Sequence, residues 1–120
     1  MIWFRKKQRL PEELTVPKIA FIGEQNGVPE QKLKSELNIL FHKTTTVRSA
    51  FLARVDYGNS DAFNIALCIS SDTQEDAELK REAGRIFSAQ FGHHEHLDII
   101  FLRIEQETDL RHVCKPFFER

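Results

Sequence analysis

The sequence predicts a single α+β domain of the ferredoxin-like βαββαβ type, with an antiparallel or mixed sheet of four strands. Two helices should cover one face of this sheet, and a short helix should follow the last strand. Two stretches with helical spacing of apolar residues each separate short apolar runs, and the two central runs alternate around a short polar loop. With 120 residues, of which 41% are hydrophobic, the chain can bury one core.

The first 17 residues form an N-terminal arm, because they show no regular spacing of apolar residues. The arm carries Trp3 and Phe4, and exposing such large rings to water is unfavourable. We therefore expect the arm to dock on another surface and residues 18–120 to form the domain.

The domain begins with a short apolar run, Lys18–Gly23, which predicts a strand. Asn26 and Gly27 are a turn signal, and Pro29 suits the first position of a helix. The helix from Pro29 gathers one stripe at helical spacing: Leu33, Leu37, Leu40, Phe41 and Thr44.

Residues 47–56 and 62–70 alternate, and the loop at 57–61 between them predicts an antiparallel hairpin. One hairpin face is expected to receive the two long helices: Phe51, Val55, Phe63, Ile65 and Leu67. The opposite face carries smaller apolar residues: Ala50, Leu52, Ala66 and Cys68.

This second face requires a cover, since a large apolar face is rarely open to solvent on a monomer. The candidates are the tail at Phe117 and Phe118, the arm at Trp3 and Phe4, and a second copy of the chain. We expect a terminus to cover the face, with a homodimer built beside it, because symmetric dimers are the commonest assembly.

A second helix is expected to run to Phe91, with Ser71 and Gln74 as a capping box and Gly92 as the C-cap. Gly84 lies inside this helix, where it costs about 1 kcal/mol relative to Ala. A close approach between helix and sheet would explain a glycine at that position.

The last predicted strand, Leu97–Ile104, is apolar on both faces, so neither face should be fully solvated. A short helix at Glu107–Cys114 is expected to follow it, before Pro116.

Charge and composition argue against several kinds of partner. The net charge of −1 argues against nucleic acid, and no run approaches the roughly 20 apolar residues of a membrane span. Cys68 and Cys114 lie in apolar strings and suggest buried free thiols. No secretion signal is visible, because Ile2, Trp3 and Phe4 precede the basic residues, so a cytoplasmic location is expected.

The sharpest local signal for chemistry is a loop with three imidazoles: His93, His94 and His96. These residues could bind a transition metal such as zinc, nickel or copper. A polar loop that happens to be rich in histidine is the commoner case, because adjacent loop residues rarely converge on one tetrahedral centre. We expect no metal, no cofactor and no catalytic residue.

The run Val47–Ala53 (VRSAFLA) resembles the V-x-x-A-[YF]-L-A strand of the C-terminal domain of SseB, the bacterial enhanced-serine-sensitivity protein. The ending Lys115–Arg120 (KPFFER) is similar to that domain's P-F-Y ending, and Ile22-Gly23 before a Pro-led helix fits its opening. Phe51 and Phe118 stand where the family more often has Tyr. The resemblance implies a bacterial domain that usually follows another domain, and it implies no defined reaction, cofactor or catalytic residue.

Three function classes remain open from the sequence. The absence of a catalytic motif and the two-faced sheet favour a non-enzymatic protein-interaction or regulatory module. The first alternative is a sensor of an amino acid or similar small molecule, and the second is a metal-dependent enzyme that uses His93, His94 and His96.

The apolar periodicity also predicts the core: Leu33, Leu37, Phe41, Phe51, Ile65, Leu67, Ile86, Phe87, Ile99 and Phe101. Truncating Phe51 or Phe87 to Ala should lower the free energy of unfolding by about 3–5 kcal/mol, because each change leaves a cavity. Denaturant melts measure this, and losses below about 1 kcal/mol for both variants would contradict the packing.

Overall fold

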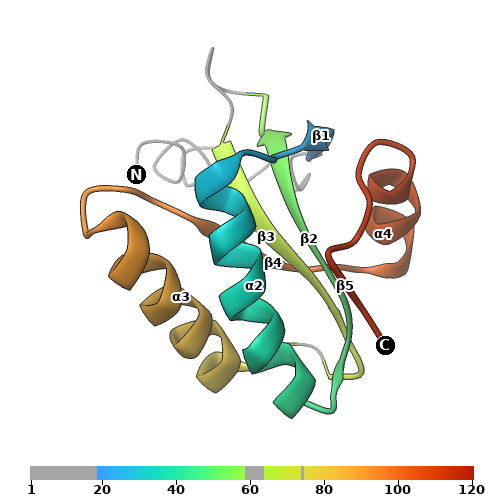
Figure 1. Cartoon of the computed structure of the whole chain (residues 1–120). Helices are drawn as coiled ribbons and strands as arrows, with labels where there is room; N and C mark the ends of the chain where they lie inside the picture. Colours follow the sequence, from blue (N-terminus) through green and yellow to red (C-terminus); the bar gives the residue numbers. More distant parts are fainter. Residues whose placement is uncertain (1–18, 59–63, 74) are drawn as a thin grey trace, which may run out of the picture.

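The computed structural model describes residues 19–58, 64–73 and 75–120, so the predicted arm at 1–17 lies outside the described residues. Figure 1 shows the elements along the chain: β1 (Ala20–Glu24), α2 (Val28–Lys43), β2 (Val47–Asp56), β3 (Asn64–Ser71), α3 (Ala77–Phe91), β4 (Asp98–Phe101), α4 (Ile104–Arg111) and β5 (Phe118–Glu119).

The sheet is mixed, with the strand order β1-β2-β3-β4. β2 is antiparallel to both β1 and β3, whereas β3 and β4 are parallel. The α+β class and the mixed sheet are therefore confirmed, but the strand order differs from the ferredoxin-like order, in which the first strand lies between the third and the fourth. The reason is the short β1, which pairs antiparallel with the end of β2, from Ala20 opposite Asp56 to Glu24 opposite Ala53. Only β3-α3-β4 forms a parallel crossover.

One edge of β2 is shared by two short strands. β1 occupies its second half, and β5 pairs antiparallel with Ser49 and Ala50 in its first half. Arg120 fixes the end of β5, because its guanidinium donates to the carbonyl oxygens of Val47 at 2.9 Å and Phe41 at 2.7 Å. The prediction of four strands therefore missed the fifth, which is formed by the tail.

The two long helices cover one face of the sheet, and α4 lies on the other side (Figure 1). Strand residues of the face under α2 and α3 include Ala50, Leu52, Leu67 and Ile69. The face under α4 includes Phe51, Ala53, Val55, Ala66 and Cys68.

The predicted faces of β2 were wrong, whereas those of the described part of β3 were correct. Phe51 lies opposite Cys68 and Leu52 opposite Leu67, and residues directly opposite each other share a face. Alternation separates the two faces of one strand, but the register between strands decides which faces join. Phe63 lies outside the described residues.

The predicted core is buried at six positions: Leu33, Leu37, Phe41, Phe51, Leu67 and Phe87. The other four are only partly buried: Ile65, Ile86, Ile99 and Phe101. Two of these four lie in β4, and one lies in α3.

The second face is covered by α4 and the chain just after it, through Leu110 and Cys114. The tail at Phe117 and Phe118, one of the three candidate covers, does not lie on this face but in the cluster under the long helices. β5 pairing sets Phe118 opposite Ala50, whose side chain faces the long helices, so the Phe118 ring packs 5.7 Å from the ring of Phe41.

The helix ends correct two further expectations. The N-cap of α2 is Gly27, so Pro29 is the second helical residue. The N-cap of α3 is Asp76, whose carboxylate accepts from the backbone N–H of Leu79 at 3.1 Å, so Ser71 is not the cap. Gly92 is confirmed as the C-cap of α3, with a positive φ of 89°.

Gly84 lies in α3 with open space beside it, since an added Cβ would meet no atom within 4 Å. The expected close approach at this position was therefore wrong. Gly84→Ala should raise the free energy of unfolding by about 0.5–1 kcal/mol, because alanine loses less backbone entropy on folding.

Gly92→Ala is the matched control, because the positive φ of Gly92 strains any residue with a Cβ. Denaturant melts should show Gly84→Ala stabilised and Gly92→Ala destabilised. A loss of stability in Gly84→Ala would contradict the open space beside α3.

Candidate functional site

The outer strand β4 is less covered than the central strands β2 and β3. In β4 only Asp98 is buried, while Ile99, Ile100 and Phe101 are partly buried. Ile99 and Phe101 belong to the apolar cluster under the long helices, and Ile100 belongs to the cluster under α4. Both clusters therefore reach the solvent at the same strand.

The backbone of β4 has one free edge among the described residues. The N–H of Leu102 donates to the carbonyl of Ile69 at 2.8 Å, which fixes the phase of the parallel ladder. Alternate residues of a strand turn their backbone groups toward opposite neighbours. Ile100 and Leu102 therefore face β3, and Ile99 and Phe101 point their N–H and C=O groups away from the sheet.

The start of β4 is held by a chain of three polar side chains. Asp98, whose side chain is only 9% exposed, accepts from the Tyr57 hydroxyl at 2.7 Å, and its other oxygen lies 2.5 Å from His96 Nε2. Burial, and then the hydrogen bond to Asp98, raise the pKa of Tyr57 above its ordinary value. The phenol therefore stays protonated and donates to Asp98, which ties the end of β2 to the start of β4.

The three histidines considered as alternative metal ligands lie together in one exposed loop. His93, His94 and His96 all lie exposed in the loop before β4, and His96 contacts Asp98. Within the described ranges, no three side chains of the His, Cys, Asp and Glu types form a group that could hold a metal ion. Sequence reasoning missed Tyr57 and Asp98. The signal for Asp98 was a carboxylate at the start of an apolar strand.

A cleft of about 390 Å³ opens at the other end of β4. It lies where the parallel strands β3 and β4 end, a common place for ligand sites in sheets with parallel strands. Its lining is Ser71, Asp72, Thr73, Glu75, Phe101, Leu102, Arg103 and Ile104. Its three charged residues are already paired, since Asp72 lies 2.7 Å from Arg48, Arg103 lies 3.1 Å from Glu105 and Glu75 lies 3.9 Å from Lys80.

The two cysteines are confirmed as buried free thiols. Burial raises the pKa of Cys68, and it raises the pKa of Cys114 to about 11. Both thiols are therefore neutral at pH 7, and a neutral thiol is a poor nucleophile.

The hydrogen bond from Tyr57 should matter more for stability than the contact of His96. Tyr57→Phe removes a donor to a buried carboxylate and should lower the free energy of unfolding by about 1.5–3 kcal/mol. His96 is 54% exposed, so His96→Ala should cost less than about 1 kcal/mol. Denaturant melts of both variants test this ranking, and the reverse order would contradict the role given to Tyr57.

No helix of the described segments is long and apolar enough to cross a membrane.

No curated protein and no solved structure matches this chain. The model of the family described as the SseB protein C-terminal domain matches residues 22–120, from β1 to the last residue, and so includes β4 with both of its ends. The chain belongs to the SseB protein C-terminal domain family.

Proposed function

We propose that this domain is a non-enzymatic protein-interaction module that binds its partner along the free edge of β4. The observation that carries the proposal is the coincidence of two features at Ile99 and Phe101. Their backbone groups point away from the sheet, and their side chains extend an apolar cluster that is only partly covered there.

A strand added at this edge would satisfy both needs at once. It would accept and donate hydrogen bonds at Ile99 and Phe101, and its side chains would cover the clusters on the two faces. Soluble proteins commonly protect an open edge with lysine, proline or a bulge. The middle of β4 reads Ile99, Ile100, Phe101 and has none of these, so its protective feature is its length of four residues.

The chemistry of the described residues supports a non-enzymatic role. Both thiols are protonated at neutral pH, and the carboxylate of Asp98 is engaged by Tyr57 and His96. A cytoplasmic location is part of the proposal, and the two free thiols support it.

The test is site-specific photo-crosslinking in cells that produce the full chain. A benzophenone amino acid in place of Phe101 should give discrete covalent adducts with protein, because it would lie within the docked edge. The matched control carries the same probe in place of Ile39, which is 63% exposed and belongs to α2 rather than to β4. Equal adducts from both positions, or none from Phe101, would contradict the proposal.

The cleft at the end of β4 supports a second candidate function, the sensing of an amino acid. It carries charges of both signs, from Asp72, Glu75 and Arg103, beside the apolar Phe101 and Leu102. A zwitterion with a side chain matches that mixture. Amino acids should then raise the melting temperature, and Arg103→Ala should abolish the shift. A screen without any shift would remove this candidate.

A further inference from the structure

We infer that the partner at the β4 edge is a second copy of this chain, paired antiparallel about a two-fold axis at Ile100. This inference rests on the interaction role proposed above and names the occupant of the same edge.

The hydrogen-bonding pattern of β4 selects this register. Ile99 and Phe101 are the two residues of β4 with outward backbone groups. With the axis at Ile100, Ile99 lies opposite Phe101 of the second copy, and each such pair exchanges two hydrogen bonds. All four outward groups of each strand are then satisfied. An axis at Ile99 or at Phe101 pairs only one of these residues with a residue of β4.

The side chains fit the same register. On the face under α2 and α3, Ile99 meets Phe101 of the second copy, and pairs of an aromatic and a β-branched residue are favourable across strands. On the face under α4, Ile100 meets Ile100 of the second copy. Asp98 lies opposite Leu102, so no like charges face each other along the strand.

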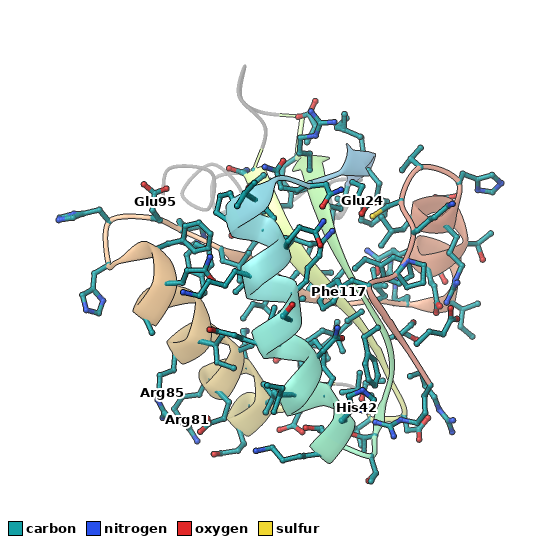
Figure 2. The ribbon with its side chains drawn as sticks, viewed as in Figure 1. Glu24, His42, Arg81, Arg85, Glu95 and Phe117 are labelled. Atoms are coloured by element: carbon teal, nitrogen blue, oxygen red, sulfur yellow. The ribbon has the colours of Figure 1, made fainter. Side chains whose placement is uncertain are left out.

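The charges beside this edge are also compatible with self-association. The axis stands perpendicular to the sheet, so the two α3 helices lie on the same face and run antiparallel. Figure 2 shows Arg81 and Arg85 on the side of α3 that is turned away from α2. Each pairs with a carboxylate three residues earlier, Arg81 with Glu78 and Arg85 with Glu82. Each of these pairs is neutral overall, so the two pairs can face those of the second copy without net repulsion.

The sharpest test is a disulfide across the axis. Residues in a pair without backbone hydrogen bonds have Cα atoms about 4.5 Å apart, which is within disulfide range. Ile100→Cys should therefore form a covalent dimer on mild oxidation. The background is Cys68→Ala, because Cys68 neighbours Ile100 across β3 and β4. Ile99→Cys and Phe101→Cys are the controls, since in this register neither cysteine lies opposite the same cysteine of the second copy.

A second measurement does not depend on a new cysteine. Sedimentation of the full chain over a concentration series should show a monomer–dimer equilibrium. Ile99→Pro removes the outward N–H and should shift the midpoint at least tenfold toward monomer. Ile99→Ala removes a similar part of the side chain but keeps the N–H, so it should shift the midpoint much less. Melting curves establish that each variant is folded.

The outcomes separate this inference from the proposed function. A covalent dimer through Ile99→Cys or Phe101→Cys, without one through Ile100→Cys, would overturn the register. A chain that stays monomeric at all concentrations and forms no covalent dimer would overturn the inference that the partner is a second copy. If the probe at Phe101 then captures a different protein, the interaction role stands. If it captures nothing, both fail.

Discussion

The fold depends on β2, the ten-residue strand from Val47 to Asp56. It is hydrogen-bonded to β1, β3 and β5, and it is buried at every position except Arg48, Arg54 and Asp56. A strand that is apolar on both faces cannot lie at the surface of a two-layer domain, because one face would remain in water. The chain therefore covers both faces of the sheet, with α2 and α3 on one side and α4 with Cys114 on the other.

The shared edge of β2 creates a second constraint at Leu52, between the stretches that pair with β1 and β5. The carbonyl of Leu52 accepts from the backbone N–H of Gln25 at 3.0 Å, and the Cys114 thiol lies 3.7 Å away. Lys34 spans the same region with a side chain only 7% exposed, held 3.0 Å from Glu24 and 3.2 Å from Asn26. A buried ammonium is tolerated there because both of these partners contact it. Removing Glu24 alone would leave the ammonium of Lys34 with too few partners. The Lys34–Glu24 ion pair is therefore needed to hold β1 against α2.

Periodicity along the sequence was sufficient for the two long helices and for the hairpin of β2 and β3, because each signal is contained within one element, whereas the short helix predicted at Glu107–Cys114 begins at Ile104, inside the strand predicted at Leu97–Ile104. Strand order and facing depend on pairing between segments distant in sequence. Alternation at Phe51 and Leu52 could not show which of them faces α2, since the answer lies in their opposite residues, Cys68 and Leu67. β5 could not be predicted for the same reason, because its two residues are too few to show a periodic pattern. At the candidate site, His96 was visible as part of a histidine run, but Tyr57 and Asp98 meet only after β2 and β4 come together.

The two edges of the sheet are finished differently, and this asymmetry supports a functional role for β4. On one side the sheet ends in two short strands, β1 and β5, which lie one after the other along β2, while on the other side it ends in the single strand β4, whose outer edge pairs with no described strand. The fully buried strand residues come from β2 and β3, so a partner at β4 would not have to displace the centre of the core. Asp98, held by Tyr57 and His96, ties down the start of β4, and the register with β3 decides which backbone groups point outward. A strand with a fixed register and an open edge is prepared for pairing, because little conformational entropy remains to be lost when another strand is added.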